Sequence, residues 1–360
     1  MKTMKYEQVR ENISVSGEHK DADVLSIMKA AIFTAPKQIE IREYSIPQPG
    51  PEEVLIKLEG CGICASSIPV WEGREWFKYP LEPGAPGHEG WGIVEAVGRN
   101  VSNIQIGERV AALSYHAFAE YDVAKYTEVV PLPDVLEGKP FPGEPLGCAI
   151  NIFGRAGIKP GDKVAIVGIG FLGSLLTKLA VQCGATVITL SQRSFSLDVA
   201  KRCGARGVVQ LKEKWTAIKE AREYNNEDGF DVVIEAVGLQ ETLDIASELT
   251  KERGRLIIAG YHQDGLRTVN MQLWNWKGID VINAHERDPQ VYIEGISEAV
   301  KSAVNGKLSP FDLITHSYKL EELNEAFQAV KNRPDGLIIS FLSVVIFDSL
   351  DITHSSSYNS

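Results

Sequence analysis

Three segments of the sequence carry side chains that could hold a metal ion. They contain Cys64, His88 and Cys148, which lie in the local sequences GCGIC, GHEG and EPLGC. A cysteine, a histidine and a second cysteine make a three-ligand set that leaves one coordination position open, as a catalytic zinc ion requires. Cys61 and Cys64 also form a CxxC pair, but the chain has no second such pair, so this motif cannot build a four-cysteine structural site.

A glycine-rich loop, GIGFLG, has the form of a dinucleotide-binding turn between an apolar run and a helical pattern. Its first glycine permits the tight turn, its second lets the backbone approach a pyrophosphate, and its third lets helix and strand pack closely. The N–H groups at the start of the helix would then contact the phosphates. The predicted cofactor-binding residues of this loop are Gly168, Gly170, Phe171, Leu172 and Gly173.

The end of the next predicted strand should lie beside the adenosine ribose of the cofactor. An acidic side chain there accepts a hydrogen bond from the 2′-hydroxyl group of NAD. This chain has Ser191 and Arg193 instead, with no carboxylate between residues 191 and 194. Because a 2′-phosphate suits arginine and nearby hydroxyl groups, the sequence predicts a preference for NADP(H) that depends on Arg193, with Ser191 beside it.

Two kinds of secondary structure are predicted to position these residues. Residues 28–132 contain short strands separated by Gly and Pro. After Pro160, apolar runs alternate with helical stretches, a pattern typical of a parallel sheet covered on both faces. Helical sequence returns at about residue 288, and the last apolar run, at residues 337–347, is predicted to be a buried strand.

Composition narrows the possible functions. The chain has 37 Lys and Arg against 48 Asp and Glu, a net charge of −11, which argues against a nucleic-acid partner. Five cysteines in 360 residues cannot form a secreted disulfide framework, so reduced thiols in a cytoplasmic protein are expected. The first 27 residues lack the apolar stretch of a signal peptide, and no apolar run reaches the length of a membrane helix, so no membrane association is predicted.

Several motifs together resemble those of the zinc-dependent medium-chain alcohol and polyol dehydrogenases. In chain order they are GCGICAS, PGHEGWGIVEAVG, GERV, EPLGCA and the glycine-rich loop. The resemblance extends from about residue 28 to residue 336. It implies that Cys64, His88 and Cys148 are catalytic zinc ligands. It also implies that Glu89 lies beside the metal as a neighbouring or exchanging ligand.

Two further residues acquire roles from this resemblance. Glu144 occupies the place where polyol dehydrogenases offer a carboxylate, so it is a reserve ligand. Ser66, two residues after Cys64, matches the hydroxyl group that relays the substrate proton in the family. Catalytic roles are therefore expected for Cys64, Ser66, His88 and Glu89.

The chain departs from the family pattern at three places. Ser67 stands where the family usually has the aspartate that hydrogen-bonds the zinc-bound histidine, a change that could loosen the metal site. Pro69 occupies the position of a relay histidine found in some members, so the proton path must differ. The cysteine-rich lobe that binds a structural zinc is absent, because residues 107–147 contain no cysteine. One zinc ion per chain is therefore predicted.

The fold implied by the resemblance is α/β, with a β-rich GroES-like catalytic domain and a doubly wound Rossmann domain. The last part of the chain is expected to return to the catalytic domain. The predicted divisions are an N-terminal extension at 1–27, the first part of the catalytic domain at 28–150, the Rossmann domain at 151–287, the return to the catalytic domain at 288–347 and a loose tail at 348–360.

The predicted reaction interconverts an alcohol and its ketone or aldehyde by hydride transfer to or from NADP(H). The resemblance favours a polyol, sugar or cyclitol as the small-molecule partner, and a homodimer or homotetramer as the assembly. Two alternatives stay open at this point. One is a zinc-free reductase of activated double bonds from the same superfamily, and the other is a non-catalytic NADP(H)-binding sensor or structural protein.

Overall fold

The structure is a computed structural model that describes residues 27–344 of the chain. The predicted tail and almost all of the predicted N-terminal extension lie outside these residues, as does the end of the apolar run at residues 337–347. Among residues 27–344, no helix combines the length and the apolar character needed to cross a bilayer.

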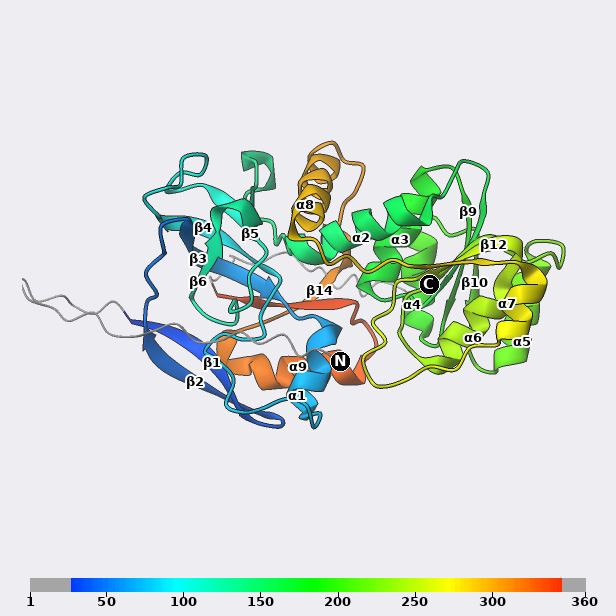
Figure 1. The fold of residues 1–360 in the computed structure, drawn as a ribbon, viewed down its shortest axis with the longest axis horizontal. Coiled ribbons are helices and arrows are strands. Elements are labelled where there is room, and N and C mark those ends of the chain that lie inside the picture. Colours follow the sequence, from blue (N-terminus) through cyan, green and yellow to red (C-terminus); the bar gives the residue numbers. More distant parts are fainter. Residues whose placement is uncertain (1–26, 345–360) are drawn as a thin grey trace, which may run out of the picture.

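Two segments of the chain, residues 27–131 and 314–343, form a β-rich part (Figure 1). Its main sheet has the strand order β14-β15-β3-β4-β5-β7, with β6 paired to β3, and a separate hairpin joins β1 and β2. The strands are β1 (Ile27–Ala35), β2 (Gln38–Ser45), β3 (Glu53–Gly62), β4 (Gly90–Val97), β5 (Arg109–Ala112), β6 (Tyr121–Lys125), β7 (Val129–Pro131), β14 (Ile314–Tyr318) and β15 (Ile339–Ser343).

A helix from the end of the chain closes the core of this β-rich part. Helix α9 (Leu323–Asn332) places Phe327 edge-on against Phe33 and Phe118, at ring-centroid distances of 5.5 and 5.9 Å. Trp71 of helix α1 (Ile68–Glu72) stacks on the same ring at 6.0 Å. Because α9, β14 and β15 pack against strands from the first half, both ends of the described chain build one core.

The middle of the chain forms a parallel sheet with the strand order β10-β9-β8-β11-β12-β13. This order reverses between β8 and β11, the kind of switch point at which nucleotides bind in α/β sheets. The strands are β8 (Lys163–Val167), β9 (Thr186–Ser191), β10 (Gly207–Gln210), β11 (Phe230–Glu235), β12 (Thr250–Ile258) and β13 (Asp280–Asn283). The helices are α3 (Phe171–Gln182), α4 (Ser194–Arg202), α5 (Lys214–Glu223), α6 (Gln240–Leu249) and α7 (Met271–Lys277).

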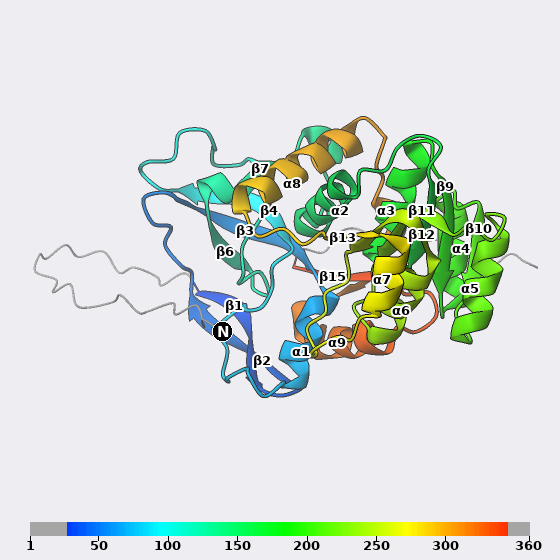
Figure 2. The same cartoon turned by 45° about the vertical axis from the view of Figure 1, so that its right-hand side comes forward.

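Both faces of the parallel sheet are covered. Val164 and Ile166 pack on one face with residues of α3, whereas Ala165 and Val167 pack on the other with residues of α5 and α6. This alternation explains why β8 is apolar throughout, since each face of the strand has its own core. Figure 2, turned by 45°, brings α7 to the front of this sheet.

Two helices lie between the β-rich part and the parallel sheet (Figure 1). Helix α2 (Gly143–Ala156) packs on helix α8 (Pro289–Val304) at two glycines. A Cβ atom on Gly295 would lie 2.8 Å from the carbonyl oxygen of Gly147, so the two backbones approach too closely for larger residues. A shared apolar cluster then connects Trp91 of β4, Ile296 of α8 and Phe171 of α3.

The predicted fold class is confirmed by this architecture. A β-rich part and a doubly wound parallel sheet are both present, and the chain returns to the β-rich part after the parallel sheet. Within the final apolar run, β15 forms a buried strand that pairs with β3.

Candidate functional site

The pairing of β3 with β4 brings the first two metal-ligand candidates together. Cys61 lies opposite Gly90 in this antiparallel pair. Cys64 follows the end of β3, and His88 and Glu89 come directly before the start of β4. Since antiparallel partners meet at the end of one strand and the start of the other, residues 24 positions apart in sequence become neighbours.

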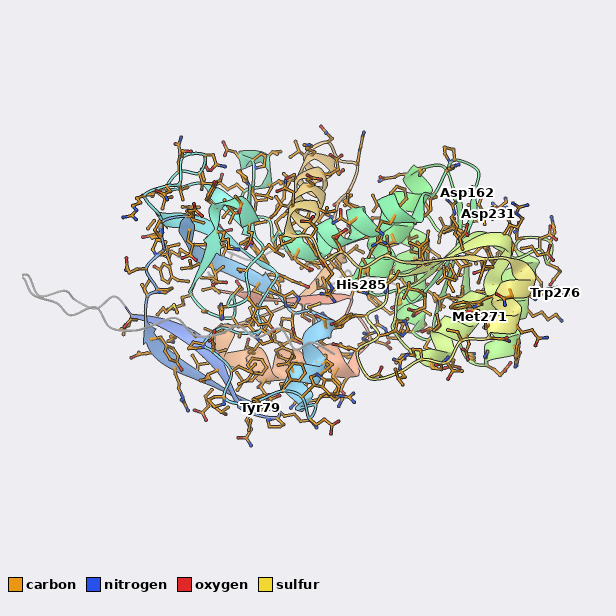
Figure 3. All side chains as sticks on the ribbon, viewed as in Figure 1. Tyr79, Asp162, Asp231, Met271, Trp276 and His285 are labelled. Atoms are coloured by element: carbon orange, nitrogen blue, oxygen red, sulfur yellow. The ribbon has the colours of Figure 1, made fainter. Side chains whose placement is uncertain are left out.

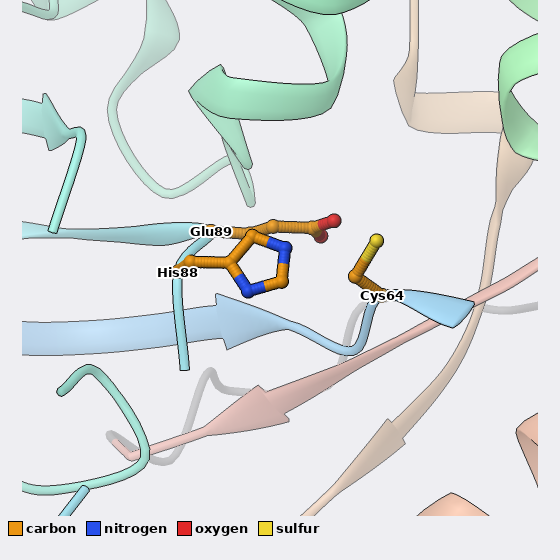
Figure 4. Close-up of side chains that lie close together, drawn as sticks. All are labelled: Cys64, His88 and Glu89. Carbon is orange, nitrogen blue, oxygen red and sulfur yellow. The ribbon is translucent and has the colours of Figure 1, made fainter. Parts of the chain in front are cut away.

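The side chains of Cys64, His88 and Glu89 form a compact cluster of donor atoms. One sulfur, one imidazole nitrogen and one carboxylate oxygen all lie within 4.8 Å of one another (Figure 4). These three donor types are the ones zinc accepts in proteins. The cluster therefore has the composition and the spacing of a metal site.

The imidazole of His88 is oriented by a backbone carbonyl. Its Nδ1 lies 2.8 Å from the oxygen of Pro86, so a neutral ring donates Nδ1–H there and keeps the Nε2 lone pair free. Figure 4 shows one ring nitrogen directed toward Glu89 and Cys64, and the other turned away. The Pro86 carbonyl thus performs the orienting role that an aspartate at the position of Ser67 would perform in the family.

Glu89 is a buried carboxyl group whose Oε2 atom lacks a partner. The residue is 2 % exposed, and Oε2 has no hydrogen-bond partner among the described residues. Burial, followed by the nearby Cys64 thiol, raises the pKa of Glu89 well above its usual value. A bound divalent cation would satisfy this oxygen and compensate its charge, so the residues present fit a metal ion.

Gly62 provides the space that the Glu89 carboxyl group occupies. A Cβ atom at position 62 would lie 1.8 Å from Oε2 of Glu89, which is far inside van der Waals contact. The sequence alone did not mark Gly62 as part of the site.

Ser66 contacts the cluster through Cys64. Its hydroxyl oxygen lies 3.1 Å from the Cys64 sulfur, on the short 3₁₀ turn Ala65–Ser67 that follows β3. Burial and the nearby carboxylate of Glu144 raise the pKa of the Cys64 thiol, while the Ser66 hydrogen bond opposes this effect. Ser66 is therefore the hydroxyl group that directly adjoins the candidate ligands.

Cys148 lies outside the three-residue cluster, on the neighbouring face of α2. Its sulfur is 3.3 Å from Oε1 of Glu144, one helical turn earlier, and 3.6 Å from the hydroxyl of Tyr292. Burial and Glu144 raise the pKa of Cys148 well above its usual value. Cys148 therefore lies beside Glu144 and Tyr292, and its role as a zinc ligand stays a prediction.

Tyr292 is a site residue that the sequence did not indicate. It lies on α8, more than 140 positions after Cys148, and reaches the thiol because α8 packs closely on α2. Burial and the neighbouring Cys148 raise its pKa. No motif surrounds Tyr292, so only the packing of these helices could have identified it.

The glycine-rich loop lies between β8 and α3, at the switch point of the parallel sheet. Gly168 has φ +105°, a conformation that larger residues rarely adopt. A Cβ atom on Gly173 would lie 2.0 Å from the Gly168 oxygen, whereas one on Gly170 would meet nothing within 4 Å. The tight turn, the close helix packing and an open backbone at the second glycine are therefore all present.

The two residues predicted to contact the adenosine ribose, Ser191 and Arg193, lie at and just after the end of β9. Ser191 is buried, and its Oγ accepts a hydrogen bond from the Arg193 backbone at 3.4 Å. Nη1 of Arg193 donates to the Leu337 carbonyl at 2.7 Å, across the boundary with the β-rich part. Burial, and next the like charge of Arg333, lower the pKa of Arg193. Among the described residues, neither arginine has a carboxylate within 4.0 Å.

A buried hydrogen-bond network holds the loop that follows β12. Glu235 is fully buried and accepts from the backbone N–H groups of Val237 and Gly238. Nε2 of His262 lies 3.0 Å from the same carboxylate, and Arg267 donates to the other ring nitrogen at 2.9 Å. His262 therefore links this loop to the carboxyl end of β11.

Two family models match consecutive parts of the chain. Residues 50–134 match the alcohol dehydrogenase GroES-like domain, and residues 172–301 match the zinc-binding dehydrogenase domain. The first covers both His88 and Cys64, and the second begins inside the glycine-rich loop.

Full-length relatives include polyol dehydrogenases. D-arabinitol dehydrogenase 1 of Uromyces fabae is 26% identical over 343 residues, which cover 85% of this chain and 95% of the relative. The sorbitol dehydrogenase of Bacillus subtilis is 27% identical over 333 residues, covering 84% and 93%.

Solved structures show the same fold. A protein assigned as a zinc-binding dehydrogenase from Sinorhizobium meliloti, bound to NADP, is 26% identical with a TM-score of 0.75, covering 88% of this chain and 99% of that one. The 2R,3R-butanediol dehydrogenase of Bacillus subtilis, at 24% identity and the same coverage of 88% and 99%, has a TM-score of 0.75 and supports the fold alone.

The contact between Gly62 and Glu89 leads to a prediction about metal binding. In Gly62→Ala, the added methyl group should displace the Glu89 carboxyl group and weaken zinc affinity about 10- to 100-fold, the range seen when groups that support a metal site are disturbed. Gly154→Ala is the matched control, because a Cβ atom there meets nothing within 4 Å. Competition with a chromogenic chelator measures both affinities, and equal zinc affinity in the two variants would contradict the role of Gly62.

Proposed function

The chain belongs to the zinc-dependent medium-chain dehydrogenase family, and we propose that it interconverts an alcohol and its ketone or aldehyde with NADP(H) as hydride carrier. We infer that the substrate is a polyol, sugar or cyclitol. The observation that carries the proposal is the cluster of Cys64, His88 and Glu89, whose donor atoms lie within 4.8 Å of one another in a dehydrogenase fold. The polyol dehydrogenases among the relatives support the substrate class.

The proposed metal is a single zinc ion per chain. Cys64, His88 and Glu89 would hold it, with Cys148 and Glu144 on α2 as further donors that adjoin the cluster. When bound, zinc supplies Lewis-acid chemistry that lowers the pKa of an alcohol and polarises a carbonyl. The absence of a cysteine from residues 107–147 supports the proposal of one zinc ion rather than two.

The protein's own groups orient the site and move the proton. The Pro86 carbonyl holds the His88 ring in the tautomer that leaves Nε2 available. Ser66 is proposed to accept the proton of the substrate hydroxyl and pass it toward solvent, since its hydroxyl adjoins Cys64 at 3.1 Å. The glycine-rich loop would bind the pyrophosphate through the backbone of Gly168, Gly170 and the first turn of α3, which includes Phe171, Leu172 and Gly173.

The cofactor preference is proposed to depend on Arg193. It follows β9, lies close enough to Arg333 for the like charge to lower its pKa, and forms no ion pair with a carboxylate among residues 27–344. A dianionic 2′-phosphate would relieve the repulsion between the two arginines and gain charge-assisted hydrogen bonds. The NADP-bound relative supports this preference.

The presence of the donor cluster favours this enzyme over both alternatives drawn from the sequence. A zinc-free double-bond reductase would need none of the three donor side chains. A non-catalytic sensor would gain nothing from a buried carboxyl group placed beside a thiol, since such a group destabilises the metal-free fold.

We infer that the chain forms a homodimer or homotetramer through the open edge of the parallel sheet. Among residues 27–344, strand β13 pairs only with β12, and Val281 of β13 is 38% exposed. Trp276 and Met271 of α7, labelled in Figure 3, are 84% and 52% exposed, and Leu266 in the preceding loop is fully exposed. A second copy of β13 would pair with this edge and cover these side chains.

Removal of the Cys64 thiol tests the metal proposal. Cys64→Ser should lower kcat by at least about 100-fold, because a metal ligand is lost, and leave the Kd of NADPH within about 3-fold. Elemental analysis should find one zinc ion per wild-type chain and less in the variant. Cys183→Ser, which changes a half-buried thiol outside the cluster, should behave as wild type. Near-normal turnover of Cys64→Ser, or zero or two zinc ions in the wild type, would refute the proposal.

Replacement of Arg193 tests the cofactor preference. Arg193→Ala should raise the KM for NADP⁺ about 10- to 100-fold through the loss of charge-assisted hydrogen bonds, with little change for NAD⁺. Arg202→Ala on α4 is the matched control, because Arg202 lies over the Phe195 ring rather than at the end of β9. A wild-type enzyme with higher kcat/KM for NAD⁺ than for NADP⁺ would be incompatible with this assignment.

The assembly prediction is tested by molar mass in solution. Light scattering with size-exclusion chromatography should show a dimer or tetramer for the wild type and a monomer for Trp276→Asp, because a buried carboxylate opposes association. Trp215→Asp on α5 is the control, since Trp215 is 59% exposed on a different helix. A monomeric wild type at micromolar concentration would rule out the proposed interface.

A further inference from the structure

The connection between β5 and β6 is a short loop that packs on the segment carrying His88. It comprises residues 113–120, within the stretch 107–147 that contains no cysteine. The N–H groups of Ala117 and Phe118 donate to the carbonyls of Gly87 and Gly84 at 2.9 and 3.0 Å. These bonds hold the loop against the residues that come directly before His88.

Tyr115 in this loop lies beside the imidazole of His88. The two rings are nearly parallel, with a centroid distance of 6.4 Å and an interplanar angle of 19°. His116, the next residue, is held by a hydrogen bond from its backbone N–H to Asp122 at 3.1 Å. Tyr115 is nevertheless 53% exposed, so the residue neighbours the candidate ligand and leaves about half of its own surface open.

A second tyrosine belongs to the part of the molecule that contains the parallel sheet. Tyr261 follows β12, is 45% exposed, and packs against His285 at a ring-centroid distance of 5.3 Å. His285 lies near the boundary between the two halves of the molecule (Figure 3). Partial burial, and after it the Tyr261 hydroxyl, raise the pKa of Tyr115.

We propose that Tyr115 determines substrate specificity by providing an aromatic face for the ring of a cyclic polyol, such as a cyclitol or a pyranose sugar. The proposal rests on the proposed dehydrogenase function and narrows its substrate class. The placement of the ring directly beside His88 would bring one hydroxyl of such a substrate to the donor cluster. The C–H face of the substrate ring would then pack on the phenol ring.

Packing against the Tyr115 ring favours a cyclic substrate over an acyclic one. A cyclic polyol presents several C–H groups on one face of a rigid ring, so it covers an aromatic surface without losing rotational freedom. An open-chain polyol must fix several bonds to present the same apolar face, and that loss offsets much of the contact energy. Tyrosine also offers a large contact area at low entropic cost, because its side chain has few rotatable bonds.

The test compares two six-carbon polyols that differ in ring closure, myo-inositol and sorbitol, together with 2-butanol as a simple alcohol. In Tyr115→Leu, the KM for myo-inositol should rise about 10-fold, which corresponds to about 1.4 kcal/mol of lost contact, while kcat changes less than about 3-fold. The KM values for sorbitol and NADP⁺ should stay within about 3-fold. Tyr115→Phe keeps the ring and should restore the KM for myo-inositol. Trp215→Leu, at an exposed site on α5, is the control for general effects.

The outcomes separate this proposal from the dehydrogenase function on which it rests. An equal rise in KM for sorbitol and myo-inositol, an unchanged KM in Tyr115→Leu, or a rise confined to NADP⁺ would overturn the role of Tyr115. Wild-type turnover of sorbitol or 2-butanol without turnover of myo-inositol would overturn it and leave the dehydrogenase function standing. No turnover of any of the three alcohols would count against both.

Discussion

The pairing of β3 with β4 is the constraint on which the candidate site depends. Because Cys61 lies opposite Gly90, the residue after β3 and the residues before β4 meet at the same end of the sheet. A shift of this pairing by one residue would turn the side chains of one strand to the other face. The pairing is in turn held from both sides, by β15 and β6 on β3 and by β5 on β4. The scaffold for Cys64 and His88 is therefore rigid.

This rigidity keeps an unfavourable arrangement of groups in place. A carboxyl group, two thiols and a second carboxylate lie close together with few opposite charges, and their mutual proximity and burial raise the pKa values of Glu89, Cys64 and Cys148. The negative charge of such groups must be compensated by bound protons or by a divalent cation. Metal binding and the protonation of the site are therefore coupled. Gly62 leaves the space that the Glu89 carboxyl group occupies, since a Cβ atom at position 62 would lie 1.8 Å from its Oε2 atom.

The two halves of the molecule meet at several independent contacts. The glycine contact between α2 and α8 aligns Cys148 and Tyr292 with the cluster. At the other end, the Arg193 side chain joins the end of β9 to the Leu337 carbonyl. Arg193, which is proposed to determine the preference for NADP(H), thus also connects the parallel sheet to the β-rich part. Cofactor binding at Arg193 would therefore act on the boundary beside which the donor cluster lies.

The sequence by itself determined the features that depend on local pattern. The alternation of apolar runs with helices identified the parallel sheet, and the spacing of three glycines identified the nucleotide loop, because both follow from backbone geometry over a few residues. Cys64, His88 and Glu89 were also selected from their motifs. Only the tertiary structure shows that donor atoms of these three residues lie within 4.8 Å of one another, because the pairing of β3 with β4 brings their segments together. Gly62, Tyr115 and Tyr292 act through contacts between segments distant in the chain, and such contacts leave no periodic signal in the sequence.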